Sequence, residues 1–225
     1  MDLVDALRGT GSVRSFTDEP VDDTVLARIL DIARFAPSGG NRQPWRVAIV
    51  RDVDLRRRLA TAMTPVWDEY AAISATGITP FSSVPPAPYE LESKRPGNVP
   101  NELLSEIARI PVVLAIAADL SRIAMMDKDL ERAPITGGAS VYPFCWNLLL
   151  AARGEGLGGV ITTFASRAEH ETGPLLGLPD GHALAATIFL GHPVTRATRL
   201  KRQPVAAFTT IDRFDGDRFD SDPAL

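Results

Sequence analysis

The sequence predicts an α+β sandwich, in which helices cover both faces of one mixed β-sheet. Apolar runs bounded by turn-forming residues predict buried strands, and the two most continuous cover 110–118 and 183–191. Helical patterns are interleaved with these runs, and the strongest covers 138–155. Because the strands are few for a chain of 225 residues, one α+β domain over 1–225 is the expected architecture.

The first half of the chain is expected to contain three helices and one strand. Asp22 or Asp23 can cap the second helix, whose apolar residues recur on one face up to about Phe35. The expected elements are a short helix over 2–8, the capped helix from 22 or 23 to 35, a strand over 45–51 and a long helix over 55–72.

The second half is expected to alternate strands with helices and to end in a β-like segment. Ser166 is a suitable N-cap for the helix that follows it. The expected elements are strands over 110–118, 159–163 and 183–191, helices over 138–155 and 167–176, and a β-like segment over 205–212 before an acidic tail.

Residues 76–100 are expected to lack regular structure, because six prolines interrupt them. Phe81 and Tyr89 lie in the same stretch, and aromatic residues are not typical of a solvated linker. A linker between domains is one interpretation. The alternative we favour is a lid-like insertion over about 77–100, because long irregular segments in compact domains often cover a ligand.

Composition excludes several classes of partner. The formal charge of −4 argues against nucleic acid, and the most basic stretch, 196–202, would serve a single phosphate equally well. No apolar run approaches the ~20 residues of a membrane span, and the acidic first residues do not form a secretory signal. Cys145 is the only cysteine, which fits a buried, inert thiol in a reducing cytoplasm.

Familiar catalytic and metal-binding motifs are missing from the sequence. Residues 154–159 superficially match a dinucleotide fingerprint, but a helix precedes them and a strand follows, which is the wrong context. No P-loop, zincin or α/β-hydrolase motif occurs, and the three histidines have no ligand-like spacing. The motifs therefore give no support for a metal site or for P-loop, zincin or α/β-hydrolase chemistry.

The segment 33–51 is the most informative part of the sequence. After a helix, Pro37 and two glycines form a breaker-rich loop, and a strand follows. Ser38, Asn41 and Gln43 supply uncharged donors and acceptors, which suit the edge of a heterocycle. A plain helix–turn–strand connector, with proline and glycine as punctuation alone, is the alternative.

Two further groups of residues suit a phosphate. Ser12 and Arg14 combine a hydroxyl with a guanidinium after a flexible glycine. Lys201 and Arg202 stand before Pro204 near the other end of the chain. Solvated loop arginines and a charged loop before an edge strand are the corresponding alternatives.

These pieces together resemble the FMN-dependent nitroreductase family. The string A-P-S-G-G-N-R-Q-P-W at 36–45 closely resembles the signature loop of that family. It is preceded by an S-x-R element at 12–14 and followed by N-L-L-L-A-A-R at 147–153, G-L-G at 156–158 and K-R-Q-P at 201–204. The similarity spans nearly the whole chain, except about 64–109. Many members carry an arginine where this chain has Thr10, and often a glutamine where it has Trp146.

The resemblance implies a nitroreductase-like three-layer sandwich that forms a homodimer, with a C-terminal arm over about 204–225 exchanged between subunits. It also implies two FMN molecules at the interface. One subunit would supply the S-x-R element, the strand after G-L-G and the basic C-terminal residues, and its partner would supply the P-S-x-x-N loop. The cofactor-binding residues implied in this way are Ser12, Arg14, Pro37, Ser38, Gly39, Asn41, Gln43, Thr162, Thr163, Lys201 and Arg202.

The activity implied by the resemblance is electron transfer from NAD(P)H through FMN to a nitroaromatic, quinone or similar acceptor, in a ping-pong cycle. Thr162 and Thr163 would lie near flavin N5 and O4, and Lys201 and Arg202 would neutralise the phosphate. Reductive dehalogenation and oxygen-dependent flavin fragmentation occur on the same fold and stay as alternatives. A flavin-binding protein without turnover, its site weakened at Thr10, is the third.

Overall fold

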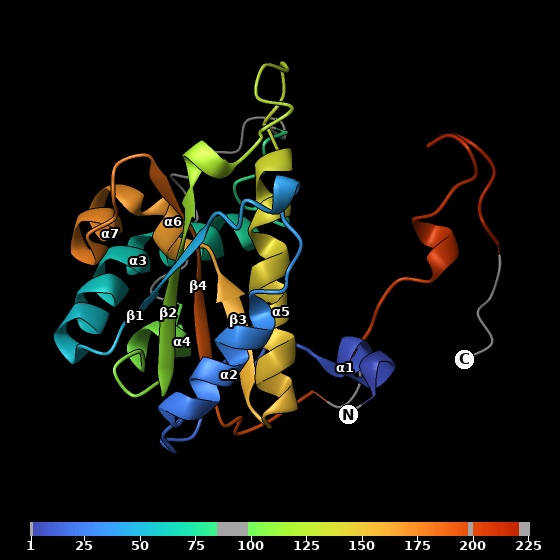
Figure 1. Ribbon diagram of the computed structural model, residues 1–225. Coiled ribbons are helices and arrows are strands. Elements are labelled where there is room, and N and C mark those ends of the chain that lie inside the picture. Colours follow the sequence, from blue (N-terminus) through green and yellow to red (C-terminus); the bar gives the residue numbers. More distant parts are fainter. Residues whose placement is uncertain (1, 85–98, 198–199, 221–225) are drawn as a thin grey trace.

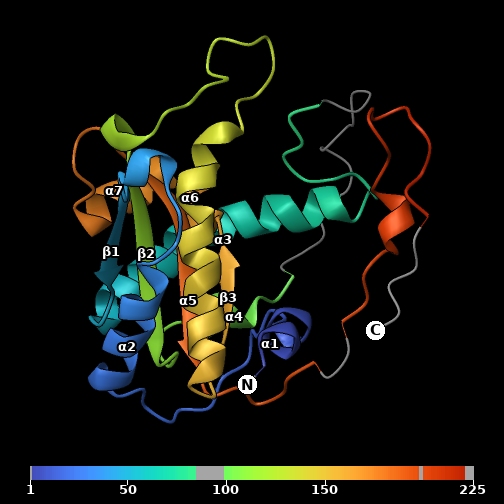
Figure 2. The ribbon, with the colours of Figure 1, turned by 45° about the vertical axis from the view of Figure 1, so that its right-hand side comes forward.

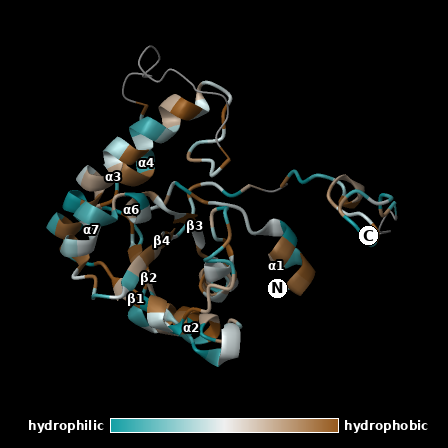
Figure 3. Ribbon diagram, turned by 90° about the horizontal axis from the view of Figure 1, so that it is seen from above, coloured by the Kyte–Doolittle hydropathy of each residue, from teal (hydrophilic) through white to brown (hydrophobic). Residues whose placement is uncertain are grey.

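The computed structural model describes residues 2–84, 99–197 and 200–220. Its centre is a four-stranded sheet in the order β1-β2-β4-β3 (Figure 1). The strands are β1 (Trp45–Ile49), β2 (Val112–Asp119), β3 (Gly158–Thr162) and β4 (His182–Gly191). Helices lie on both sides of the sheet, as Figure 3 shows from above, so the predicted α+β sandwich is confirmed.

The strand pairing is simpler than the mixed sheet that the sequence predicted. All three ladders between the named strands are antiparallel. Parallel pairing in the described residues is confined to one isolated bridge, between Ser12 and Gly159 at the edge of β3. A mixed sheet is therefore the wrong description of the ladders, although the bridge places the N-terminal segment along an outer strand.

The first face of the sheet is covered by α2 (Asp23–Ala33) and α5 (Tyr142–Gly154). Leu148 of α5 and Ile116 of β2 are fully buried in this layer. Trp45, at the start of β1, stacks on Phe144 with ring centroids 4.8 Å apart and planes 6° from parallel. Cys145 lies in the same layer, and burial raises the pKa of its thiol to about 12, which confirms the predicted inert cysteine.

The second face is covered by helices from two parts of the chain, α3 (Val53–Ser74) and α4 (Glu102–Ser105) from the first, and α6 (Phe164–Arg167) and α7 (Glu169–Leu176) from the second. The C-terminal half of α3 extends past the sheet (Figure 2). Arg56 of α3 is buried and donates hydrogen bonds to the carbonyls of Val50 and Ile110, at 2.7 and 2.6 Å. This arginine ties the segment after β1 to the segment before β2.

Local signals fixed some helix ends correctly. The Asp22 side chain accepts the Thr24 N–H, so it is the N-cap that the sequence predicted. The helix expected from 138 starts instead at Tyr142, after a 3₁₀ turn over Thr136–Ser140. Pro143 explains the later start, because proline is tolerated in the first turn of a helix but not in its interior.

The expected cap at Ser166 is wrong. Ser166 lies inside α6, and its hydroxyl is buried without a hydrogen-bond partner in the described chain. The predicted helix over 167–176 corresponds to α7, which begins at Glu169, and the short helix α6 before it was not predicted.

The ends of the chain are the least packed parts of the structure. The first helix, α1 (Leu3–Gly9), exposes Leu3 and Leu7. In Figures 1 and 2, residues 200–220 lie apart from the sheet. The predicted β-like segment at 205–212 is wrong, because this region forms a 3₁₀ turn over Val205–Ala207 and one isolated bridge from Thr210 to Arg218.

The predicted irregular segment can be followed only in part. Residues 75–84 form turns and bends, in agreement with the prediction. Phe81 lies 6.3 Å from the ring of Tyr70, and the Arg167 guanidinium lies 4.1 Å above the Phe81 ring. Tyr89 and the rest of the prediction for 85–98 fall outside the described residues.

Candidate functional site

The N-terminal segment brings Ser12 and Arg14 to the edge of β3. The N–H of Val13 donates to the carbonyl of Gly159 at 2.9 Å, within the parallel bridge. Further along, Phe16 pairs with Pro193, just past the end of β4. Arg14 lies between these two contacts, directly after the bridge to β3.

A cavity of about 660 Å³ opens at this end of β3. It brings together three of the predicted cofactor-binding residues, Arg14, Thr162 and Thr163. Its wall also contains residues that sequence reasoning missed, namely Trp67, Tyr70, Asn101, Glu102 and Phe164. Trp67 and Tyr70 stack at 5.8 Å, and Phe164 meets both rings edge-on, so one side of the cavity is aromatic.

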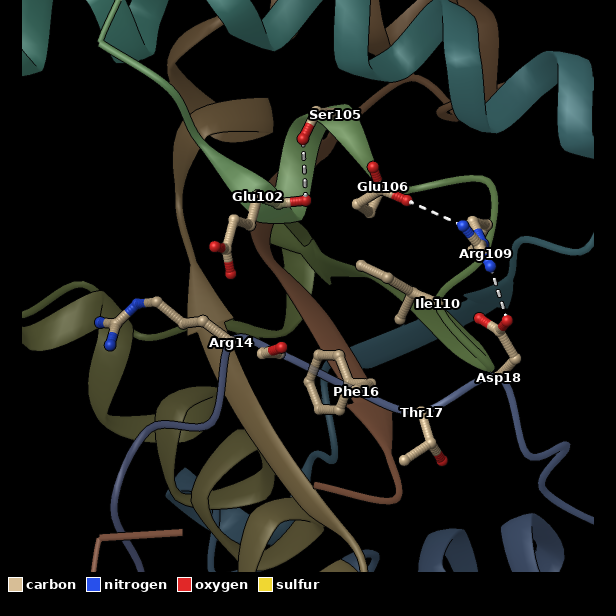
Figure 4. Close-up of a pocket in the computed structure, with 10 residues that line it drawn as sticks. Arg14, Phe16, Thr17, Asp18, Glu102, Ser105, Glu106, Arg109 and Ile110 are labelled. Atoms are coloured by element: carbon tan, nitrogen blue, oxygen red, sulfur yellow. Dashed lines mark hydrogen bonds and ion pairs between the residues drawn. The ribbon is translucent and has the colours of Figure 1, made fainter. Parts of the chain in front are cut away.

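A second, more polar cavity of about 480 Å³ adjoins the first and shares Arg14 and Glu102 with it (Figure 4). At its far end Arg109 forms an ion pair with Asp18 at 2.7 Å. Figure 4 shows the Arg14 side chain pointing away from that pair. Arg14 forms no ion pair within the described residues, so its charge is available to an anionic ligand.

The loop after α2 holds the remaining polar residues of the predicted site in a compact turn. The Ser38 hydroxyl accepts the Gln43 N–H at 2.9 Å, and the Gln43 side-chain amide donates to Asn41 Oδ1 at 3.1 Å. Gly40, Asn41 and Gln43 have positive φ angles of 60°, 51° and 47°. Such angles are costly for residues other than glycine, so tertiary contacts must hold this loop in shape.

One such contact reaches the loop from the region before α5. The Ser140 hydroxyl accepts the Gly39 N–H at 3.1 Å. Further back, the Thr136 hydroxyl and the Ile135 N–H donate to Asp127 at 2.5 and 2.8 Å. These two hydrogen bonds hold the pKa of Asp127 well below its usual range. Asp127 could not be predicted from the sequence, because its partners come from a loop with no recognisable turn motif.

The predicted cofactor-binding residues thus fall into three groups. Four lie along β3 and its neighbour, and we call them the strand group. Five lie in the loop after α2, and we call them the loop group. The strand group is Ser12, Arg14, Thr162 and Thr163, the loop group is Pro37, Ser38, Gly39, Asn41 and Gln43, and the third group is Lys201 with Arg202. Among the described residues, no hydrogen bond joins one group to another.

Thr10 does not replace the family arginine with a polar contact of its own. Its side chain is buried, and its hydroxyl donates to the carbonyl of Ala6 at 2.6 Å. Thr10 therefore closes the end of α1 rather than facing a ligand.

Metal and membrane chemistry find no structural support in the part of the chain that is described. No group of three histidine, cysteine or acidic side chains there is placed to hold a metal ion. None of its helices combines the length and the apolar character that crossing a membrane requires.

Comparison with known proteins identifies the family. A sequence profile of the nitroreductase family matches residues 7–192, and the chain belongs to this family. A nitrobenzene nitroreductase of Ectopseudomonas oleovorans is 30% identical, over 83% of this chain and 85% of its own length. A 5,6-dimethylbenzimidazole synthase of Rhodobacter capsulatus is 29% identical, over 85% and 83%.

A solved structure gives the same fold. The NADPH:FMN oxidoreductase of Vibrio harveyi, determined with NAD⁺, superposes with a TM-score of 0.63 at 21% identity. The match covers 91% of this chain and 74% of that one. The predicted nitroreductase-like fold is therefore confirmed.

Proposed function

We propose that this chain is an FMN-dependent oxidoreductase, which uses NAD(P)H to reduce nitroaromatic, quinone or similar acceptors. The observation that carries the proposal is the cavity at the end of β3, where Arg14 meets Thr162 and Thr163 beside an aromatic wall. Membership of the nitroreductase family and the 30% identity to a nitrobenzene nitroreductase support it. In a ping-pong cycle NAD(P)H leaves before the acceptor binds, so this one cavity can serve both in turn.

The donor set of the site fits FMN in kind. Arg14 supplies a permanent charge for a phosphate, and Lys201 and Arg202 supply two more just before the C-terminal arm. Uncharged side chains and backbone N–H groups of the loop group suit the edge of the flavin ring. When bound, FMN supplies the redox chemistry, taking a hydride from NAD(P)H and passing two electrons to the acceptor.

The protein's own part in this proposal is to bind, orient and enclose. Thr162 donates its hydroxyl to the Thr187 carbonyl at 3.4 Å, which fixes its side chain at the base of the cavity. Thr163 is exposed and offers an unengaged hydroxyl within the described residues. Trp67, Tyr70 and Phe164 form an aromatic wall against which an aromatic acceptor can pack.

We further propose a homodimer in which each FMN lies between the strand group of one subunit and the loop group of its partner. Within one chain the two groups are not joined by hydrogen bonds. Apolar side chains also stay uncovered on α1 and on the C-terminal arm, where Phe208 is 70% exposed. Such surfaces are typical of protein–protein contacts, so the arm is better explained by docking on a partner than by hanging in water.

The same proposal assigns the segment over about 77–100 to the mouth of the acceptor pocket. Phe81 packs on Tyr70, and Tyr70 lines the cavity, so the visible part of this segment extends the aromatic wall. A single domain over 1–225 and a cytoplasmic location complete the proposal, since a lone cysteine fits a reducing compartment.

Purification tests the core of the proposal directly. The recombinant protein is expected to be yellow, or to become so on incubation with FMN, and to lose its colour anaerobically with NADH or NADPH. Heat-released cofactor is then compared with FMN and FAD standards. FAD in the extract, or no flavin after incubation with FMN, contradicts the proposal.

A flavin enzyme of the same fold with different chemistry is the second candidate. It is favoured by the 29% identity to a 5,6-dimethylbenzimidazole synthase, which is nearly the identity to the nitroreductase. Anaerobic turnover of nitrobenzene with NAD(P)H supports the first candidate. Loss of FMN with formation of a new aromatic product, only in the presence of oxygen, supports the second.

A further inference from the structure

Arg153, in the last turn of α5, has an unusual environment. Its Nε atom is buried and has no hydrogen-bond partner among the described residues. Its guanidinium lies against the end of α1, where a Cβ built on Gly9 would come within 2.5 Å of Arg153 Nη2. A guanidinium normally satisfies its donors when it is taken out of water, so this one is short of an acceptor.

A second arginine lies beside it. Arg196 Nη2 donates to the carbonyls of Gly156 and Leu157, both at 3.0 Å, in the turn between α5 and β3. Burial, and then the positive charge of Arg153, lower the pKa of Arg196. The turn between α5 and β3 thus has one arginine just before it, at the end of α5, and a second bound to its carbonyls. Two like charges at one partly buried turn are unfavourable unless an anion joins them.

No carboxylate of the described residues balances the pair. Glu155 is the nearest acid along the chain, but both its oxygens bind Arg28, at 3.2 and 2.8 Å. Helix α1, whose end meets Arg153, carries Arg8 in its last turn, which is a further positive charge. The negative end of the α5 dipole can stabilise one positive charge at this turn, and Arg196 already takes that place by binding the carbonyls of the turn. The charge of Arg153 is left without a counterpart.

The pair lies next to the predicted phosphate ligands. Ser12 bridges Gly159, only two residues after the Leu157 carbonyl that Arg196 binds. A Cβ on Gly11 would lie 2.8 Å from the side chain of Leu200, so the segment that carries Lys201 and Arg202 passes the same point. Thr10, where many family members have arginine, is turned inward between these contacts.

We propose that Arg153 and Arg196 form an anion site for a phosphate group beside Ser12, and that this pair supplies the cation missing at Thr10. Two guanidinium groups offer paired N–H donors with the geometry that phosphate oxygens accept. The phosphate is that of FMN or one carried by the nicotinamide nucleotide. This choice of ligand rests on the proposed function, whereas the anion site itself does not.

The first experiment uses inorganic phosphate on the purified full-length protein. Phosphate is expected to raise Tm of the wild type in a saturable way, with the apparent Kd weakened at least about tenfold in Arg153→Gln and in Arg196→Gln. Arg57→Gln, an exposed arginine on α3, is the matched control and keeps the wild-type Kd. Equal Kd values in wild type and both variants overturn the anion site.

Stability in phosphate-free buffer separates a binding role from a structural one. Arg153→Gln is expected to keep or raise Tm, because it relieves repulsion and an unmet donor. A large fall in Tm of Arg153→Gln would make Arg153 a structural residue and contradict the proposal. Arg153→Lys keeps the positive charge but lacks the paired N–H donors of a guanidinium, so it is expected to retain only part of the phosphate affinity.

The second experiment identifies the source of the phosphate. If the site binds the phosphate of FMN, the ratio of FMN to riboflavin affinity is expected to fall at least about tenfold in both variants. If it binds the additional phosphate of NADPH, both variants are expected to lose preference for NADPH over NADH. If the wild type binds phosphate but no flavin, and the two variants lose phosphate binding, the anion site stands and the proposed function is refuted. If the protein binds flavin, but the variants keep the wild-type phosphate Kd and the wild-type ratio of FMN to riboflavin affinity, the proposed function stands and the anion site is refuted.

Discussion

The strand group and the loop group are built in different ways. The strand group sits on β3 and on a segment that pairs with it through backbone hydrogen bonds, so its geometry follows from the sheet. The loop group is held by side-chain hydrogen bonds, and two of its members, Asn41 and Gln43, have positive φ angles, as does Gly40 between Gly39 and Asn41. A site that joins the two groups would combine a rigid support with a strained, separately anchored loop.

The difference also explains why neither group is a complete site. The strand group has a cavity and a free charge but few uncharged donors, whereas the loop group has donors but lines none of the cavities described above. If the two meet across a dimer interface, assembly and cofactor binding depend on each other.

The largest expected effect comes from separating the groups onto different chains. Arg14→Ala and Asn41→Ala chains, each defective alone, are co-expressed with different tags and the mixed dimer is measured. Because a two-fold dimer has two equivalent sites, the mixed dimer isolated through both tags is expected to have one intact site of its two, which is about half of the wild-type sites. Arg14→Ala mixed with Arg202→Ala is the control and stays defective, since both changes affect one side. Equal recovery in both mixtures refutes the division between subunits.

The charge of the strand group is tested by Arg14→Ala. We expect FMN affinity to fall by about 1.5–3 kcal/mol, because a charge-assisted contact to the phosphate is lost. That loss is roughly a 10- to 150-fold higher Kd by flavin titration. Arg57→Ala serves as a matched loss of charge outside the site. An unaltered Kd would mean that the phosphate lies elsewhere.

The strain of the loop group is tested by Gly40→Ala. A side chain at the φ of +60° found here costs roughly 1–2 kcal/mol, and the new Cβ would also lie 3.2 Å from the Arg42 guanidinium. Urea unfolding is expected to show this loss. Gly154→Ala is the control, because its Cβ meets open space and its φ is not in the strained range. Equal stability of the two variants would remove the argument for strain.

The smallest effect is expected at the aromatic wall. Phe81→Ala removes the contacts with Tyr70 and Arg167, and aromatic pairs contribute about 0.5–1.5 kcal/mol. KM for nitroaromatic and quinone acceptors is therefore expected to change several-fold, with FMN content unchanged. Val84→Ala, in the same segment and exposed, is the comparison. Unchanged kinetics on every acceptor would assign the segment to a linker.

Sequence alone predicted the fold where a local signal existed. The apolar runs located all four strands, and Asp22 was a correct cap because capping depends on a few neighbouring residues. Signals that compete were misjudged. Pro143 shortened a helix whose apolar pattern continued, and Ser166 suited a cap although burial placed it inside a helix.

The site was predictable to the extent that a family motif carried it. Arg14, Thr162 and Thr163 do meet in one cavity, as the resemblance implied. Trp67, Tyr70 and Phe164 were missed, because they come from distant elements and share no motif. The Arg153–Arg196 pair was missed for the same reason. The two arginines are 43 positions apart in the sequence, and only the fold brings them to the turn after α5.

The lone thiol of Cys145 makes this molecule a reporter of its own opening. A sulfhydryl with a pKa of about 12, sealed between α5 and the sheet, reacts with an alkylating or disulfide reagent only while that layer is open. With no other cysteine in the chain, each modified molecule records one such event. When the reagent reacts faster than the layer closes, the rate of mass increase in native buffer measures how often the core opens, and at lower reagent concentration it measures the fraction of molecules that are open.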